Sequence, residues 1–211
     1  MDEFSVIIPK DNTLTEEKVE LGKLLFFDKR LSLDGTVSCA TCHNTKLAFT
    51  DGQPVSVGIK QQKSKLSAPT IINRVFTSEQ FWDGRAGTLE EQAKAPLANP
   101  VEMGSQSHDQ VVKQLKDIKG YRQLFKEAFG TDDFDIRNVA KAIASFERTL
   151  MSGNSAFDKF EAGDDEKALS ESAKRGLAIF RSKGECSVCH AGFNFSREAG
   201  FRSVCHNQER A

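Results

Sequence analysis

The chain has 211 residues, of which 38% are hydrophobic, and its formal net charge is −1. A charge this close to zero excludes the strongly basic surface that binds nucleic acid or an anionic membrane, and no run of about 20 apolar residues is present to span a bilayer. The length fits one large domain or two small ones, and the opening stretch MDEFSVIIPK is too polar and too short for a secretory signal.

The first predicted element is an amphipathic helix. Thr13 and Glu16 have the spacing of a capping box. They precede four apolar residues at helical spacing, which are Val19, Leu21, Leu24 and Leu25, with charged residues on the other face. The sequence therefore predicts that this helix begins near Thr13 and packs one face on a core.

A Cys-x-x-Cys-His pentapeptide follows at Cys39–His43 and recurs at Cys186–His190. Paired cysteines alone are compatible with disulfides, a zinc site or a redox dithiol. A zinc site does not require a histidine directly after each pair, and the turn-rich stretch before Cys39 does not suit a thioredoxin-like strand. Attachment of c-type haem accounts for every residue: two thiols three positions apart form thioethers with the haem vinyl groups, and the next residue, histidine, binds iron. Two copies predict two haems.

Between about residues 50 and 105 lies a long stretch punctuated by proline and glycine. Loops of this length inside a compact domain are usually functional. The rest of the chain has helical periodicity, at residues 107–118, 121–130, 135–150 and 170–184. The sequence predicts an all-α protein of two small helical haem domains, 1–152 and 153–211, with four phenylalanines as core residues: Phe146, Phe157, Phe160 and Phe180.

Several motifs, in a fixed order, resemble the bacterial dihaem cytochrome c peroxidase family, which includes the maturation enzyme of methylamine dehydrogenase. They are SCATCHN, SAPTIINRVF, QFWDGRAGTLEEQAKAPLANPVEMG and GLAIFRSKGECSVCHAGFNF, and the resemblance runs from about residue 21 to 195. It implies two cytochrome c-like domains, with a peroxidatic haem in the first and an electron-transfer haem in the second. The implied enzyme is an oxidoreductase that reduces hydrogen peroxide to water with electrons from a small cytochrome c or copper protein.

The resemblance also implies a periplasmic location, with a signal peptide removed from this sequence, and leaves a homodimer open. It assigns the two haems to six residues. Cys39 and Cys42 would hold the peroxidatic haem with His43 as its iron ligand, and Cys186, Cys189 and His190 would do the same for the second haem.

Four further residues resemble the family's catalytic pocket. Trp82 resembles a tryptophan between the haems, where an aromatic ring can relay an electron; a lone core tryptophan is the plain alternative. Glu102 resembles the carboxylate over the peroxidatic iron, and a base is needed there because cleavage of the O–O bond moves a proton from one oxygen to the other. Gln92 and Pro96 resemble residues that complete the pocket.

Asn73 resembles a side-chain ligand of a calcium ion between the domains, although an exposed turn asparagine would look the same. Arg85 is expected to pair with a haem propionate on charge grounds, its alternative being a solvated surface ion. Both assignments rest on the resemblance and on side-chain chemistry.

The sequence departs from the family in three places. Relatives continue well beyond the second haem and there supply its sixth ligand, so the second domain is expected to be truncated here. Cys205 and His206 in the tail lack the upstream cysteine of a third motif. Ile59 stands where many relatives have a histidine ligand, and we therefore expect an open peroxidatic iron; His108 is expected to begin a helix, and Lys60, Lys63 and Lys65 would have to lose a proton to ligate.

Three other functions remain open at this point. A dihaem oxidase of a protein substrate would share the pocket and differ in its partner surface. A dihaem electron carrier without peroxidase activity would have both irons six-coordinate. A structural zinc protein would be colourless.

Overall fold

The computed structural model describes residue 6 and residues 8–196, and it divides the chain into two compact units. The N-terminal unit is Ile7–Met151. The C-terminal unit contains Ser152 and the residues after it, described as far as residue 196. Each is treated separately here. The described residues form helices and turns, with isolated β-bridges and no strand, so the predicted all-α class is confirmed.

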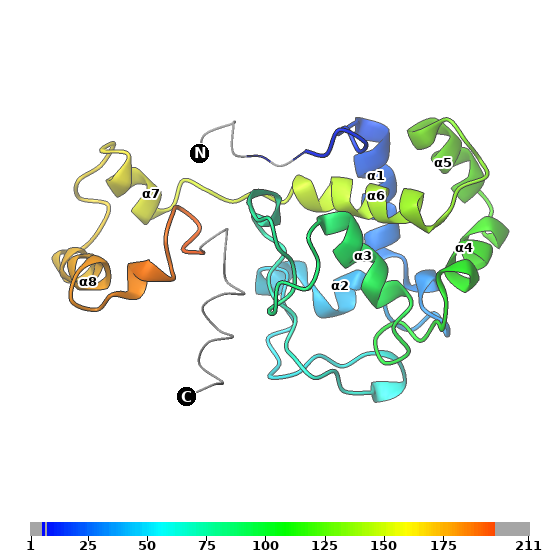
Figure 1. The fold of residues 1–211 in the computed structure, drawn as a ribbon, viewed down its shortest axis with the longest axis horizontal. Coiled ribbons are helices and arrows are strands. Elements are labelled where there is room, and N and C mark those ends of the chain that lie inside the picture. The colour runs from blue at the N-terminus through cyan, green and yellow to red at the C-terminus, as the bar shows by residue number, and fades with distance from the viewer. Residues whose placement is uncertain (1–5, 7, 197–211) are drawn as a thin grey trace. The chain divides into compact units, whose positions relative to one another are not determined.

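The N-terminal unit is organised around two helices that cross closely, α1 (Glu16–Phe27) and α6 (Ile136–Arg148) (Figure 1). A Cβ placed on Gly22 of α1 would lie 1.9 Å from the carbonyl oxygen of Ala142 in α6. Only glycine permits this approach, because any side chain would overlap the facing backbone. The two helices then bury a common apolar core that includes Leu21, Leu25, Phe26, Val139 and Ile143.

The remaining helices of this unit cover that pair. They are α2 (Cys39–Cys42), α3 (Leu89–Leu97), α4 (His108–Asp117) and α5 (Tyr121–Phe129), with single 3-10 turns at Lys29–Leu31, Thr45–Leu47, Ile59–Gln61 and Arg74–Phe76. Phe125 of α5 stacks on Phe134 with ring centroids 3.6 Å apart, and both rings are buried. The result is one continuous core for this unit.

The first helix begins two residues later than its sequence pattern indicates. Its N-cap is Thr15, whose hydroxyl accepts a hydrogen bond from the backbone N–H of Lys18. The carbonyl of Thr13 instead accepts a hydrogen bond from Nζ of Lys18 at 2.8 Å. Thr15 therefore caps the helix, and Thr13 contributes its carbonyl to Lys18 instead.

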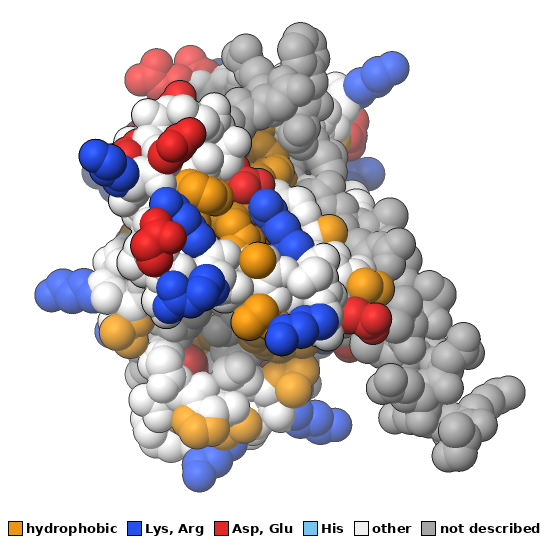
Figure 2. Space-filling view, turned by 90° about the vertical axis from the view of Figure 1, so that its left-hand side faces the viewer, with side chains coloured by type: hydrophobic (Ala, Val, Ile, Leu, Met, Phe, Trp, Pro, Cys, Tyr) orange, Lys and Arg blue, Asp and Glu red, His pale blue; other side chains and the backbone are white. Residues whose placement is uncertain are grey.

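The C-terminal unit has helices but no buried core in its described part. It contains α7 (Ala156–Glu161), α8 (Glu171–Arg181) and a 3-10 turn at Cys186–Val188. No residue from 152 to 196 is classed as buried, and Ile179, Val188, Phe193 and Phe195 are exposed hydrophobic side chains. On the face viewed in Figure 2, hydrophobic side chains lie at the surface among lysines and arginines.

Of the four phenylalanines predicted to be core residues, Phe146 is buried, at 6% exposure, whereas the other three are half-buried. The core prediction is therefore wrong for Phe157, Phe160 and Phe180 within the described residues. Phe157 and Phe180 do pack against Phe195, with ring centroids 4.7 and 5.7 Å away. A segment this short has too few side chains to enclose the rings that it contributes.

The long stretch between α2 and α3 forms an ordered set of turns. A short hairpin at residues 56–66 is closed by hydrogen bonds between Ser56 and Leu66 and between Gly58 and Gln62. In the part of the chain that the structure describes, no helix has the length and hydropathy needed to cross a membrane.

Candidate functional site

The first Cys-x-x-Cys-His motif forms one turn of helix. Ser38 caps α2 in a capping box with Thr41, and the backbone N–H of His43 donates to the carbonyl of Cys39 at 2.9 Å. The i, i+3 spacing sets Cys39 and Cys42 on one side of that turn, and both are free thiols. Two neighbouring thiols with a histidine at the end of the turn are the donor set that a covalently attached haem needs.

The imidazole of His43 is held in one orientation by the backbone. Its Nδ1 lies 3.0 Å from the carbonyl oxygen of Phe49. A donor at Nδ1 leaves Nε2 with a free lone pair, which is the arrangement of a metal-ligating histidine. Burial lowers the pKa of His43, so the ring is neutral and able to ligate near pH 7.

The second motif repeats this geometry in the other unit. The N–H of His190 donates to the carbonyl of Cys186 at 2.9 Å, and Nδ1 lies 3.1 Å from the carbonyl oxygen of Phe195. Phe49 and Phe195 both have positive φ, 58° and 51°, a rare conformation for a bulky residue. The backbone carbonyls of these two phenylalanines therefore orient the two histidines. They were not identified from the sequence, although a phenylalanine does follow each histidine, six residues after His43 and five after His190.

The electrostatics of the first motif do not favour reactive thiolates. Burial, followed by the carboxylate of Glu147, raises the pKa of Cys39 to about 12, and burial also raises the pKa of Cys42. Zinc binding and thiol exchange both require an anionic sulfur, and no group of three or more His, Cys, Asp or Glu side chains among the described residues is placed to hold a metal ion. A thioether sulfur is neutral, so the site fits haem attachment better than either alternative.

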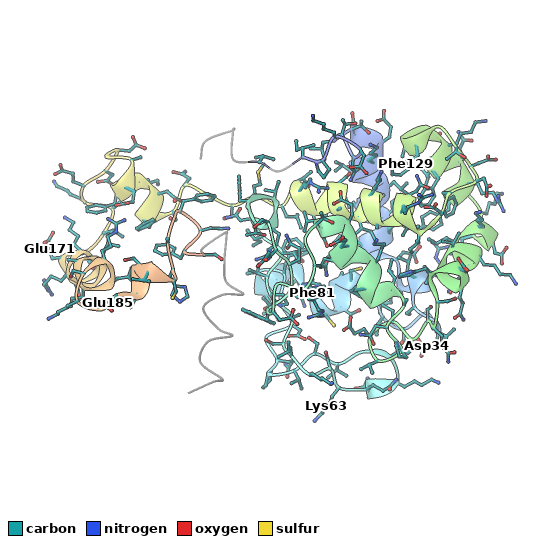
Figure 3. The ribbon with its side chains drawn as sticks, viewed as in Figure 1. Asp34, Lys63, Phe81, Phe129, Glu171 and Glu185 are labelled. Carbon is teal, nitrogen blue, oxygen red and sulfur yellow. The ribbon has the colours of Figure 1, made fainter. Side chains whose placement is uncertain are left out.

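A cavity of about 500 Å³ opens beside the motif. Thr41 and Cys42 line it on one side, and Val57, Gly58 and Lys60 of the hairpin line it on the other. Asp34 also lines it, and Figure 3 labels Asp34 together with Lys63, which lies on the outer edge of the hairpin.

Glu102 lies in the turn that follows α3. Its Oε1 accepts a hydrogen bond from Nδ2 of Asn99 at 2.9 Å. Burial raises the pKa of Glu102, and the guanidinium of Arg85 partly opposes that rise. Glu102 also acts electrostatically on Cys39 and Cys42, so the structure brings this carboxyl into the neighbourhood of the first motif.

The hairpin holds the backbone of Glu102 from the other side. The N–H of Ile59 donates to the carbonyl of Glu102 at 3.0 Å. A Cβ on Gly58 would lie 2.1 Å from the carbonyl oxygen of Val101 and 2.7 Å from Cα of Glu102. The hairpin and the Glu102 turn can meet only because residue 58 has no side chain.

Ile59 is a buried core residue, 1% exposed, in the place where the family pattern has a histidine. The predicted helix start at His108 is confirmed: α4 begins there, and Nε2 of His108 lies 3.0 Å from the carbonyl of Lys94. Lys60, Lys63 and Lys65 are all exposed.

Gln92 and Pro96 lie one turn apart on α3. Proline has no N–H, so the carbonyl of Gln92 lacks its usual helical donor. Arg85 lies with its guanidinium carbon 3.5 Å from the ring centroid of Phe81, which Figure 3 labels, and it pairs with Asp83 at 2.8 Å. Arg85 thus contacts the ring of Phe81 and pairs with Asp83, and its charge also acts on Glu102.

Of the other predicted residues, Trp82 is exposed and Asn73 is half-buried in the N-terminal unit, and two lie outside the described residues. Trp82 is 58% exposed, and its Nε1 donates to the carbonyl of Ser67 at 3.0 Å, so it is not a core tryptophan. Asn73 has a positive φ of 62°, and its N–H donates to the carbonyl of Leu150 at 2.9 Å. Cys205 and His206 lie outside the described residues.

Residues 16–166 match a protein-family model described as di-haem cytochrome c peroxidase. The methylamine utilization protein MauG of Methylorubrum extorquens is 45% identical over 92% of this chain and 55% of its own length. The cytochrome c551 peroxidases of Pseudomonas aeruginosa and Nitrosomonas europaea are 45% and 44% identical, over 89% and 83% of this chain and 54% and 52% of theirs. The chain therefore spans about half the length of these relatives.

Two solved structures are also similar to this chain. A MauG-like protein associated with microbial copper homeostasis superposes with a TM-score of 0.81 at 33% identity, covering 94% of this chain and 59% of its own. The diheme peroxidase BthA of Burkholderia thailandensis superposes with a TM-score of 0.74 at 26% identity, covering 85% and 50%.

Proposed function

This chain belongs to the di-haem cytochrome c peroxidase family, and from that premise we propose that it carries two covalent c-type haems and reduces hydrogen peroxide to water. Residues 1–152 would form the peroxidatic haem domain, and residues 153–211 the beginning of the electron-transfer haem domain. Cys39, Cys42 and His43 would hold the first haem, and Cys186, Cys189 and His190 the second. The balanced reaction takes two electrons and two protons per peroxide and forms two waters.

The observation that carries this proposal is the position of Glu102. A half-buried carboxyl lies within electrostatic reach of the first motif, and burial raises its pKa above the ordinary value of a glutamate. A general acid–base group works best when its pKa is near the operating pH. Glu102 can therefore take a proton from one oxygen of bound peroxide and return it to the other.

The haem, when bound, would supply the redox-active iron at which peroxide is reduced. The chain's own residues do the rest. His43 would bind the iron through Nε2, with Nδ1 oriented by the carbonyl of Phe49. Arg85, positively charged and close to Glu102, would pair with a propionate, and Gln92 and Pro96 would border the pocket.

The electrons would come from a small cytochrome c or copper protein, and the location would be the periplasm. We propose that Trp82 relays electrons between the haems, since its ring is oriented by the hydrogen bond to Ser67 and stays accessible. Asn73 would contribute an amide oxygen to a calcium ion, the kind of ligand that calcium prefers.

Replacing Glu102 with Gln tests this function. The variant keeps the size of the side chain and removes the titrating group, so both haems and the fold should be retained while peroxide turnover falls by roughly 10²–10⁴-fold. Turnover is measured with a reduced small cytochrome c, and Glu20→Gln on the exposed face of α1 is the matched control. Unchanged turnover in Glu102→Gln would move the acid–base role elsewhere, with Gln92 examined next.

Oxidation of a protein substrate is the second candidate function, because the MauG proteins are as similar to this chain as the peroxidases are. Incubation with peroxide and a candidate protein, followed by mass analysis of that protein, separates the two activities. A dihaem carrier with no peroxidase activity would instead show no high-spin ferric iron.

A further inference from the structure

Asn99, a residue with no role assigned so far, makes several of the hydrogen bonds that form the turn containing Glu102. It follows directly after the C-cap of α3. Its backbone N–H donates to the carbonyl of Pro96 at 3.1 Å, and its carbonyl accepts from the N–H groups of Met103 and Gly104 at 3.1 and 2.9 Å. The backbone of Asn99 therefore closes the turn on both sides of Glu102.

The side chain of Asn99 uses both ends of its amide. Oδ1 accepts from the backbone N–H of Val101 at 2.9 Å, and Nδ2 donates to Oε1 of Glu102 at 2.9 Å. The orientation of the amide follows from the chemistry, since a backbone N–H can only donate and must face the oxygen. The NH₂ end is then the only end that can face the carboxyl.

We propose that Asn99 is a positioning residue for Glu102, holding Oε1 as a hydrogen-bond acceptor and leaving Oε2 as the oxygen that takes up and returns the proton. An oxygen that accepts an N–H at 2.9 Å is a poor place for a proton, because the proton would face the donor hydrogen. No partner for Oε2 is present among the residues that the structure describes. This inference rests on the proposed acid–base function of Glu102.

Other groups around Glu102 fit this role. The backbone of Glu102 is held independently, through the hydrogen bond from Ile59 and the close approach of Gly58. The charged or titratable groups that face its carboxyl are Arg85, Cys39 and Cys42. Arg85 favours the ionised carboxyl, and the two thiols do not titrate once they are thioethers. Asn99 is the group whose hydrogen bond selects between the two oxygens.

A hydrogen bond to an ionised carboxylate stabilises the ionised form. From the geometry of this hydrogen bond we expect the Asn99 donor to favour the ionised carboxyl of Glu102. Removing this donor should raise the pKa of Glu102 further, by roughly one pH unit. At a fixed pH the ratio of ionised to protonated Glu102 should then fall by about tenfold.

Two variants test the proposal on the haem-loaded protein. Asn99→Ala removes the donor without adding charge, and Asn99→Ser removes the amide donor, also without adding charge, while keeping a side-chain oxygen that can accept from the N–H of Val101, so it preserves the turn if Ala does not. The first readout is the infrared titration of the Glu102 carboxyl in ferric protein without peroxide, with Glu102→Gln identifying its band. The second is the pH profile of kcat/KM for peroxide.

We expect both variants to raise the infrared pKa of Glu102 and to move the acidic limb of the pH profile upward by the same amount. If Asn99→Ala fails to fold, Asn99→Ser decides alone. A Glu102 pKa that stays within 0.3 of a pH unit, roughly twofold in ionisation, in every folded variant overturns the proposal. If Glu102→Gln leaves turnover unchanged while the infrared pKa still shifts, the Asn99 contact is supported and the proposed function is what fails.

Discussion

At the scale of single residues, His43 and His190 face the same kind of partner. Each ring directs Nδ1 toward the carbonyl of a phenylalanine that has positive φ, at 3.0 and 3.1 Å. Such a bond fixes the tautomer and makes Nε2 a better ligand. Each copy of the pentapeptide is thus followed by a loop that supplies the same kind of carbonyl partner to its histidine.

Glu147 is a buried carboxyl for which we predict a pH effect on stability. It is 4% exposed, its Oε2 has no hydrogen-bond partner among the residues that the structure describes, and burial raises its pKa from 4.5 to about 8, with Arg148 opposing. Between pH 4.5 and 8 the folded state then binds more protons than the unfolded state, so stability falls as pH rises through this window. Glu147→Gln should remove that loss, worth up to about 1.4 kcal/mol per pH unit.

The measurement is urea unfolding of the haem-loaded protein at pH 5 and pH 8. The stability of Glu147→Gln relative to the original chain should increase from the lower pH to the higher. Glu20→Gln, at an exposed position, is the control and should show no such trend. A difference that is the same at both pH values would contradict the raised pKa.

Ile59 leads to a prediction about the resting enzyme. Its side chain is buried and has no lone pair for iron, and its N–H is bonded to Glu102. We therefore expect the ferric peroxidatic haem to be five-coordinate or water-bound and to react with peroxide without prior reduction. Stopped-flow mixing of ferric protein with peroxide should change the haem spectrum at once; a low-spin spectrum that responds only after reduction would refute this.

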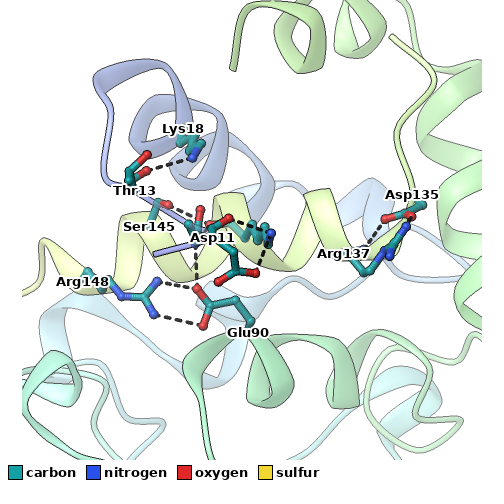
Figure 4. Close-up of polar contacts among 10 residues, drawn as sticks. Asp11, Thr13, Lys18, Glu90, Asp135, Arg137, Ser145 and Arg148 are labelled. Atoms are coloured by element: carbon teal, nitrogen blue, oxygen red, sulfur yellow. Dashed lines mark hydrogen bonds and ion pairs between the residues drawn. The ribbon is translucent and has the colours of Figure 1, made fainter. Parts of the chain in front are cut away.

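At the scale of elements, an ion-paired network ties α3 to α6. Arg148 forms two hydrogen bonds to the carboxylate of Glu90, at 2.7 and 3.0 Å, and Nδ2 of Asn12 donates to the same carboxylate at 2.7 Å (Figure 4). Asn12 also bonds to the carbonyl of Lys141 on α6. Because α3 carries Gln92 and leads into the turn of Glu102, this network sets the position of the helix that presents the candidate site.

Breaking that network should be costly. The side chains of Arg148 and Glu90 are only 3% and 15% exposed, and removal of one partner leaves a buried charge, which costs about 3–5 kcal/mol. We predict that Arg148→Met lowers the free energy of unfolding by that amount. Arg148→Met combined with Glu90→Gln should cost less than the sum of the two single changes.

The control for this prediction is Arg137→Met. Arg137 pairs with Asp135 on the surface of the same unit, at 79% and 45% side-chain exposure, where a pair contributes at most about 1 kcal/mol. Urea unfolding followed by far-UV circular dichroism measures all variants. Equal losses in Arg148→Met and Arg137→Met would mean that burial adds nothing to the Glu90–Arg148 pair.

At the scale of the whole molecule, the two units differ in how they are stabilised. The N-terminal unit has a continuous buried core, whereas residues 152–196 have no buried residue. We expect the second haem to contact the hydrophobic side chains that are exposed in this unit, and a bound group that contacts the folded state stabilises it. The second haem should therefore matter more to its unit's fold than the first does.

Limited proteolysis tests this difference. A variant with Cys186→Ala and Cys189→Ala should keep the first haem and lose attachment of the second. We predict rapid cleavage within residues 152–196 and an intact N-terminal fragment, identified by mass, whereas the two-haem protein should be cleaved far more slowly. Equal protection of both proteins would show that the second unit is stable without its haem.

Much about this protein follows from the sequence alone. Helical periodicity predicted the all-α class, and the paired motifs with the ordered segments between them predicted the family, because both signals depend on neighbours along the chain. The start of α4 at His108 followed from a local capping signal in the same way. The N-cap of α1 did not, because the capping-box spacing favoured Thr13, whereas Thr15 caps the helix.

Only the tertiary structure decided how the candidate site is held together. The carbonyls of Phe49 and Phe195 depend on positive φ values that bulky residues rarely adopt. The contact of Gly58 with the turn of Glu102 joins segments more than 40 residues apart. Asn99 gives no distinctive signal in sequence, since its role depends on which way its amide faces after the turn has formed. These features come from loop conformation and long-range packing, and neither residue type nor periodicity predicts those well. The residues for thioether attachment and iron binding lie within five consecutive positions, so they can be identified from the sequence.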